Sequence, residues 1–186
     1  MTSARPLVVI IGPPGAGKTR VGKRVAGLLH CRFVDTDRRI VDGHGSIPEL
    51  FSRFGEEHFR AIERVEVAKS LGEDAVVALG GGAILNADTR RDLTDLPVAL
   101  LTVSREAVQS RISGTGRPLL ADGLESWDRL VADRNGLYRS LATRTWDTSG
   151  HRVEDLAREV AQWTQEQRSQ DQRRQQQRSQ EERTSE

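Results

Sequence analysis

The segment Gly12–Thr19, with the sequence GPPGAGKT, has the residue types and spacing of a phosphate-binding loop. An apolar run precedes it at 7–11, and a segment with helical spacing follows at 18–29, so the motif joins a strand to a helix. Glycines let backbone N–H groups surround phosphate oxygens, and the helix N-terminus adds partial positive charge. Lys18 would reach the β- and γ-phosphates, and the Thr19 hydroxyl would ligate Mg²⁺. The loop residues predicted to contact a nucleoside triphosphate are Gly12, Gly15, Ala16, Gly17, Lys18 and Thr19.

Two carboxylates, Asp35 and Asp37, stand one residue apart at the end of a second predicted strand, 32–35. In an extended segment, residues i and i+2 share a face, so both side chains can point into one cleft. A nucleotide–Mg²⁺ complex favours a nearby carboxylate, and an acceptor hydroxyl needs one to orient it and take its proton. The alternative is a helix N-cap followed by a solvated acid. Beside a phosphate loop we interpret the pair as functional, with one aspartate for each task.

Three consecutive glycines, Gly80, Gly81 and Gly82, follow the apolar run 75–79. Such a run has a high cost in backbone entropy, and it suits a backbone that approaches a ligand closely and offers N–H donors. A sharp strand-to-helix turn is the alternative interpretation.

Arginines supply the cationic groups that a phosphoryl-transfer site needs. Arg60 can pair with Glu63 at spacing i,i+3 on a helix, although an exposed ion pair would look the same. The segment 111–122 contains Arg111 and Arg117 and is broken by two glycines and a proline, which is typical of a closing lid that excludes water. Arg117 could then neutralise charge on the transferred group. A surface loop with two solvated arginines is the alternative.

Apolar runs alternate with helical patterns, which predicts a parallel sheet covered by helices on both faces. The predicted strands are 7–11, 32–35, 75–79, 97–103 and 145–148. The predicted helices are 18–29, 37–43, 48–71 with a break near Gly55, 88–95, 104–112, 125–142 and 153–165. Ligands of such sheets gather at the carboxyl ends of the strands, so the phosphate loop, the aspartates and the glycines should converge there.

The composition excludes several classes of protein. The 186 residues fit one domain, and 28 basic against 27 acidic residues give no argument for a nucleic-acid or membrane partner. No apolar run approaches the ~20 residues of a membrane span, and a single cysteine, Cys31, fits a reducing compartment, so we expect a cytoplasmic protein. The three tryptophans are interpreted as packing residues. No aliphatic or aromatic residue follows Trp163, so 166–186 is predicted to be a disordered or frayed helical tail.

Together these motifs resemble the shikimate kinases, which are nucleoside monophosphate kinase-like P-loop enzymes. The matching segments are 12–19, 35–37, 46–51, 55–63, 79–83, 117–120 and 134–138. The resemblance implies a three-layer α/β/α fold with a five-stranded parallel sheet of order 2-3-1-4-5. It implies one kinase domain over 1–165 with a lid at about 112–124, acting as a monomer. The implied reaction transfers the ATP γ-phosphate to the 3-hydroxyl of shikimate, with Mg²⁺.

The resemblance also assigns the acceptor side of the site. Asp37 would hold the acceptor hydroxyls and act as base. Arg60 and Arg134 would bind the substrate carboxylate together with the glycines Gly80, Gly81 and Gly82, and Glu63 would orient Arg60.

On the donor side, the same resemblance places Asp35 behind the Mg²⁺ waters, beside Thr19. Arg117 would reach the phosphates from the lid, and Arg111 and Arg152 would lie near the nucleotide. The implied catalytic set is therefore Asp37, Lys18 and Arg117.

Two alternatives remain open from the sequence. The first is another small-molecule P-loop kinase, for gluconate or a nucleoside monophosphate, since the proline pair of the phosphate loop also occurs in adenylate kinases. The second is a nucleotide-binding regulator without transfer activity.

Overall fold

A parallel sheet of five strands forms the centre of the molecule, in the order β2-β3-β1-β4-β5. The computed structural model describes residues 4–112 and 123–184. The strands are β1 (Val8–Ile11), β2 (Arg32–Asp35), β3 (Ala75–Ala78), β4 (Val98–Thr102) and β5 (Arg144–Asp147). Each observed strand end lies within one residue of the predicted end, and the strand order is the one that the resemblance implied, so the fold prediction is confirmed.

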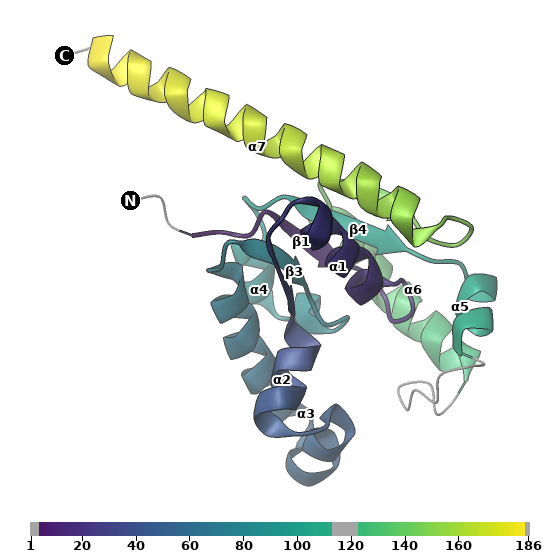
Figure 1. Ribbon diagram of the computed structural model, residues 1–186. Helices are drawn as coiled ribbons and strands as arrows, with labels where there is room; N and C mark the ends of the chain where they lie inside the picture. Colours follow the sequence, from purple (N-terminus) through teal and green to yellow (C-terminus); the bar gives the residue numbers. More distant parts are fainter. Residues whose placement is uncertain (1–3, 113–122, 185–186) are drawn as a thin grey trace.

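Helices connect the strands and cover both faces of the sheet (Figure 1). They are α1 (Lys18–Leu28), α2 (Thr36–His44), α3 (Ile47–Leu71), α4 (Ala87–Asp92), α5 (Arg105–Ile112), α6 (Leu124–Leu141) and α7 (Val153–Thr184), with a short 3₁₀ turn η1 (Ala83–Leu85). The predicted helices all appear within a few residues of their expected bounds, except that α7 continues far beyond the predicted end.

Successive side chains of the buried strands point to opposite faces of the sheet, which creates two separate hydrophobic cores. Val8 and Ile10 of β1 pack in one cluster with α1 and the first half of α7, whereas Val9 and Ile11 pack in the other with α3 and α6. Cys31 is half-buried at the edge of the first core, as expected for a small packing residue. A strand with apolar side chains on both faces must lie inside a layered α/β fold, because both faces need a covering helix.

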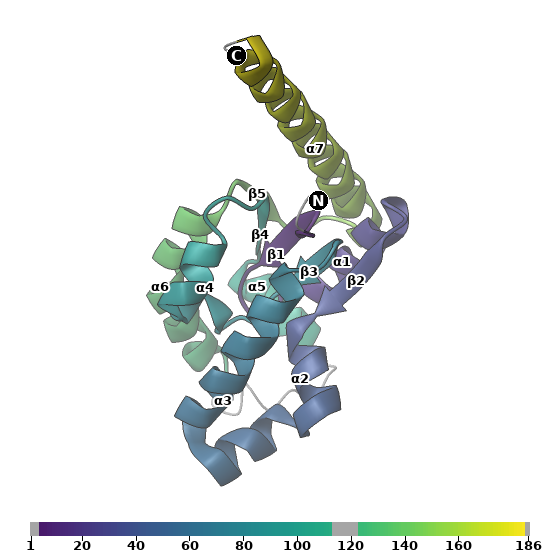
Figure 2. The ribbon, with the colours of Figure 1, turned by 90° about the vertical axis from the view of Figure 1, so that its left-hand side faces the viewer.

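Helices α2 and α3 form a projection at one end of the molecule (Figure 2). Ser46 and Glu49 cap the start of α3 reciprocally, in a capping box. Gly55 then interrupts the helix with a φ of 83°, which confirms the predicted break. A small cluster around Ile40 and Phe59 packs α2 against α3. The projection is thereby held to the body close to the C-terminal end of β2.

Helix α7 extends past the body of the molecule and contains most of the stretch predicted to be a disordered or frayed helical tail (Figure 1). The structure therefore differs from the disordered form of that prediction. Its first turns pack on the core, and the later residues are rich in Gln, Arg and Glu, which favour helix continuation. An exposed ion pair between Arg5 and Asp171, 2.6 Å long, connects this part to the N-terminal segment.

Most of the predicted lid, about 112–124, lies outside the described residues, and Arg117 with it. Within the part of the chain that the structure describes, the helices are too polar or too short for one to cross a lipid bilayer.

Candidate active site

The phosphate loop joins β1 to α1 as the motif predicted. Gly17 is the N-cap of α1 with a φ of 84°, and Gly12, with a φ of 143°, lies against the carbonyl of Leu101 on β4, where a Cβ atom would overlap it. Lys18 Nζ donates hydrogen bonds to the carbonyl oxygens of Gly12 at 2.8 Å and Pro13 at 3.2 Å. These contacts hold the ammonium group over the loop, where a phosphate ligand would need it.

Thr19 and Asp35 meet at the start of α1 and the end of β2. The Thr19 hydroxyl donates to Asp35 Oδ2 at 2.6 Å, and Asp35 Oδ1 accepts the backbone N–H of Arg38 at 3.1 Å. Asp35 is therefore the N-cap of α2 and also faces the phosphate loop, so the two interpretations of this residue are compatible. Among residues 4–112 and 123–184, no group of three or more His, Cys, Asp or Glu side chains is placed to hold a metal ion by itself. A hydroxyl beside one carboxylate fits Mg²⁺, which keeps waters and binds phosphate oxygens.

Asp37 lies in the first turn of α2 and is half-buried between the donor and acceptor sides. Burial raises the pKa of its carboxyl from 3.8 to about 6, opposed by the charge of Lys18 and reinforced by that of Asp35. Glu63 and Arg60 act on the same carboxyl with opposite signs. One carboxylate thus interacts with both the phosphate-loop lysine and the predicted acceptor arginine.

Thr36 anchors this turn, although sequence reasoning did not select it. Its side chain is fully buried, and its hydroxyl accepts the backbone N–H of Gly80 at 3.0 Å. The bond joins the start of α2 to the glycine segment after β3. The sequence around Thr36 does not indicate this hydrogen bond, because its partner is a backbone group after β3, far along the chain.

Two of the three glycines, Gly80 and Gly82, are required for space, whereas a Cβ on Gly81 would make only ordinary contacts. None of them has a positive φ, so the sharp-turn interpretation does not explain them. A Cβ on Gly80 would overlap the Asp37 carboxylate and lie 3.1 Å from Glu63 Oε1. A Cβ on Gly82 would lie 2.9 Å from the central carbon of the Arg60 guanidinium. The backbone after β3 therefore passes directly beside the charged groups of α2 and α3.

Arg60 is more than a surface ion pair. It donates to Glu63 Oε2 at 2.7 Å, and the Glu63 side chain is only 4% exposed. Its guanidinium also pairs with Glu56 at 3.1 Å and lies 5.4 Å from the ring centroid of Phe59. A buried carboxylate and an aromatic face hold the planar group in one orientation. This is the positioning of Arg60 by Glu63 that the resemblance implied.

Helix α6 brings two side chains to Gly81. Arg134 Nη1 donates to the Gly81 carbonyl at 3.3 Å, and the Tyr138 hydroxyl donates to the same oxygen at 2.6 Å. Burial raises the pKa of Tyr138 to about 12, so the phenol keeps its proton. Arg134 is thus placed next to the glycine segment, while its neighbour Arg139 bonds to Asn135 on its own helix. The contact of Tyr138 was not anticipated.

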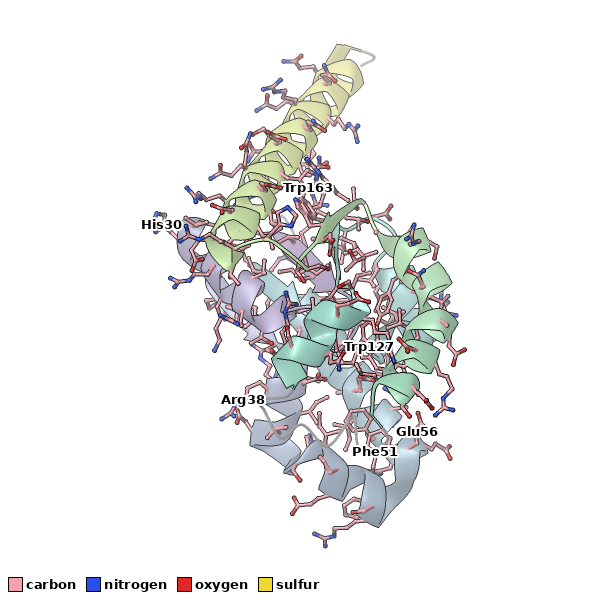
Figure 3. All side chains as sticks on the ribbon, turned by 90° about the vertical axis from the view of Figure 1, so that its right-hand side faces the viewer. His30, Arg38, Phe51, Glu56, Trp127 and Trp163 are labelled. Carbon is pink, nitrogen blue, oxygen red and sulfur yellow. The ribbon has the colours of Figure 1, made fainter. Side chains whose placement is uncertain are left out.

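Trp127, also on α6, contacts the donor loop. Its indole N–H donates to the carbonyl of Pro14 at 2.9 Å, and the side chain is buried in the middle of the molecule (Figure 3). The interpretation as a packing residue was incomplete, because the ring also makes a hydrogen bond to the phosphate loop.

The remaining predicted nucleotide residues have different surroundings. Arg111 of α5 donates to the carbonyl of Gly15 at 2.8 Å and to Thr148 Oγ1 at 3.1 Å, so it joins the phosphate loop to the end of β5. Arg152 is exposed before α7, where its carbonyl accepts the N–H of Asp155. The geometry places Arg111 beside the loop, and a nucleotide contact of Arg152 stays a prediction.

A sequence model of the family described as "Shikimate kinase" matches residues 14–165. The chain belongs to the shikimate kinase family. The shikimate kinase of Thermobifida fusca is 44% identical over 164 residues, covering 86% of this chain and 95% of the relative. That of Corynebacterium efficiens is 39% identical over 161 residues, covering 84% and 95%.

A shikimate kinase from Acinetobacter baumannii, solved in complex with shikimate, has a similar structure. Its TM-score is 0.80 at 33% sequence identity, covering 89% of this chain and 95% of that one. The family model's match over 14–165 includes α2, α3, the glycine segment and the phosphate loop from Pro14 onward.

Proposed function

We propose that this chain transfers the γ-phosphoryl group of ATP to the 3-hydroxyl of shikimate, giving ADP and shikimate 3-phosphate. The observation that carries the proposal is the setting of Asp37. Its carboxyl interacts with Lys18 of the phosphate loop and with the Arg60–Glu63 pair of α3. A base between a phosphate-binding lysine and a carboxylate-binding arginine fits transfer to a hydroxyl of an anionic small molecule.

The acceptor side suits a compact molecule with one carboxylate and several hydroxyls. Arg60 lies beside Gly82 and Arg134 beside Gly81, and hydrogen bonds to Glu63 and to the Gly81 carbonyl hold the two guanidinium groups in place. A guanidinium binds a carboxylate through two parallel hydrogen bonds, which orients the bound molecule. Such orientation contributes much of the rate in phosphoryl transfer, because the reaction needs alignment more than covalent chemistry.

The donor side suits ATP with Mg²⁺. Thr19 Oγ1 would hold the metal directly and Asp35 through water, and the metal would neutralise charge on the phosphates. Lys18 would stabilise the phosphates from the loop, and Arg117 stays a proposed partner from the lid segment.

A lone pair of the 3-hydroxyl oxygen forms a bond to the γ-phosphorus while the bond to the β–γ bridging oxygen breaks, and ADP leaves with that electron pair. Asp37 takes the hydroxyl proton. Burial and its neighbouring charges give its carboxyl a pKa of about 6, so it is ionised at neutral pH and more basic than an ordinary aspartate.

An ADP-release assay on the purified chain with ATP and Mg²⁺ tests the proposal. Shikimate, gluconate, AMP and CMP are offered in parallel, and we expect turnover with shikimate alone. Chelation of the metal should abolish that turnover. Turnover with gluconate or a nucleotide instead would identify a different kinase. ATP binding without transfer to any acceptor would favour the regulator. The cytoplasmic location and the monomeric state stay predictions from the sequence.

A further inference from the structure

Helix α6 contacts both sides of the site through one stripe of side chains. Arg134 follows Trp127 by seven residues and Tyr138 follows it by eleven, which correspond to about two and three helical turns. All three therefore lie on the same face of α6. Trp127 reaches the donor loop at Pro14, whereas Arg134 and Tyr138 reach the acceptor segment at Gly81.

The two loops also lie close together at the same point, with room for about one methyl group between them. A Cβ on Gly81 would lie 3.4 Å from Cδ of Pro14 and 3.5 Å from the Tyr138 hydroxyl. Pro14 thus accepts a hydrogen bond from the indole of Trp127 and lies next to the glycine segment. Helix α6, the phosphate loop and the glycine segment are therefore mutual neighbours: α6 bonds to both loops, and the two loops lie next to each other.

From this arrangement we infer that Trp127 is a positioning residue for phosphoryl transfer. It would act by fixing the phosphate loop relative to the acceptor segment that the same helix holds. The inference rests on the proposed function. Trp127 contacts the loop through the Pro14 carbonyl, which carries no phosphate ligand in a loop that binds through N–H groups. Its loss should therefore leave the binding of each substrate nearly intact and reduce the rate of transfer, which depends on alignment.

Trp127→Phe tests the inference because it removes the N–H donor and keeps an aromatic ring. The loss of one hydrogen bond costs about 1 kcal/mol, which corresponds to a decrease in rate of about fivefold to tenfold. We expect kcat to fall by about that factor, with the KM for shikimate and the Kd for ADP within about twofold of the wild-type values. The rates are normalised to folded protein and measured well below the melting temperature.

Trp146→Phe is the matched control. Trp146 is also buried, and its indole N–H donates to Glu159 at 3.2 Å, but it packs against Trp163 of α7 in the other core. Figure 3 places Trp163 beside α7 and Trp127 close to α5 and α6. The control variant should lose stability and keep kcat. An unchanged kcat in Trp127→Phe, or an equal loss in Trp146→Phe, would overturn the positioning role.

A nucleotide titration separates this inference from the proposed function. Addition of ADP should change the tryptophan fluorescence of the wild type and of Trp146→Phe, and should not do so in Trp127→Phe, because Trp127 contacts the nucleotide loop. The same fluorescence change in Trp127→Phe would show that Trp127 does not sense the loop, whatever the acceptor is. A wild type without shikimate turnover would overturn the proposed function and the role in transfer together.

Discussion

Asp37 combines two properties that are difficult to obtain in one carboxyl. Burial and the neighbouring carboxylates Asp35 and Glu63 raise its pKa, whereas Lys18 and Arg60 lower it, and the balance is about 6. With only the cations nearby, the group would be a weak base. Without the cations, burial and the neighbouring carboxylates would raise its pKa further. The pairing of Glu63 with Arg60 therefore affects the basicity of Asp37 as well as the orientation of the arginine.

Asp37→Asn should reduce kcat by about 10²–10⁴-fold, the range found for loss of a general base, and should leave ADP binding nearly unchanged. Steady-state kinetics and calorimetric titration with ADP measure the two effects. For the wild type, kcat/KM should fall as the pH decreases below about 6, because protonated Asp37 cannot accept the hydroxyl proton. A variant that keeps the wild-type kcat would remove Asp37 from the mechanism.

The same pKa makes a prediction about stability. The carboxyl is protonated in both folded and unfolded chains below pH 3.8 and ionised in both above about 6. Between these values the folded chain binds more protons, so the free energy of unfolding contributed by Asp37 decreases as the pH rises. Asp37→Asn has no titrating carboxyl at this position, so its free energy of unfolding does not decrease with pH for this reason. Its melting temperature relative to the wild type should therefore increase from pH 4.5 to pH 7 (about the window of the shift). A difference that is constant, or that shrinks over this range, would contradict the assignment.

At the scale of elements, the segment after β3 leaves no room for a side chain at Gly80 or Gly82. Gly82→Ala would place a methyl group against the Arg60 guanidinium, so we expect the KM for shikimate to rise by about tenfold or more, as when a charged anchor is displaced. Gly136→Ala is the control, because a Cβ there meets nothing within 4 Å on an exposed face of α6. That variant should gain about 0.4–1 kcal/mol of stability with unchanged kinetics. Equal kinetics in both variants would show that Arg60 can move aside without effect.

Sequence reasoning performed differently for elements and for contacts. The alternation of apolar runs with helical patterns was sufficient to predict the five strands. The presence of a glycine was sufficient to predict the helix break at Gly55. The strand order came from the family resemblance. The contacts of Thr36, Trp127 and Tyr138 were missed because each bonds to a backbone group far along the chain. Side-chain type gives the donor or acceptor, and only the tertiary fold gives its partner.

At the scale of the molecule, the outer part of α7 is separate from the site. An ion pair between two exposed side chains, Arg5 and Asp171, links it to the N-terminal segment and contributes at most about 1 kcal/mol. Removal of 166–186 should therefore leave kcat and both KM values unchanged and shift the melting temperature by no more than about 4 °C. Circular dichroism should report the loss of helix. A large loss of activity would show that this segment supports the kinase body.

The order β2-β3-β1-β4-β5 also separates the two halves of the reaction in space. Of the proposed acceptor residues, Asp37, Arg60 and the glycines follow β2 and β3 on one side of the phosphate loop, and Arg134 reaches them from α6, whereas Arg111 with the end of β5 lies on the other side. Substitutions that change the recognised acceptor can therefore accumulate on one flank without disturbing the nucleotide flank. For protein engineering, this makes α2, the first half of α3 and the glycine segment the region to randomise, with α6 left intact as the common frame.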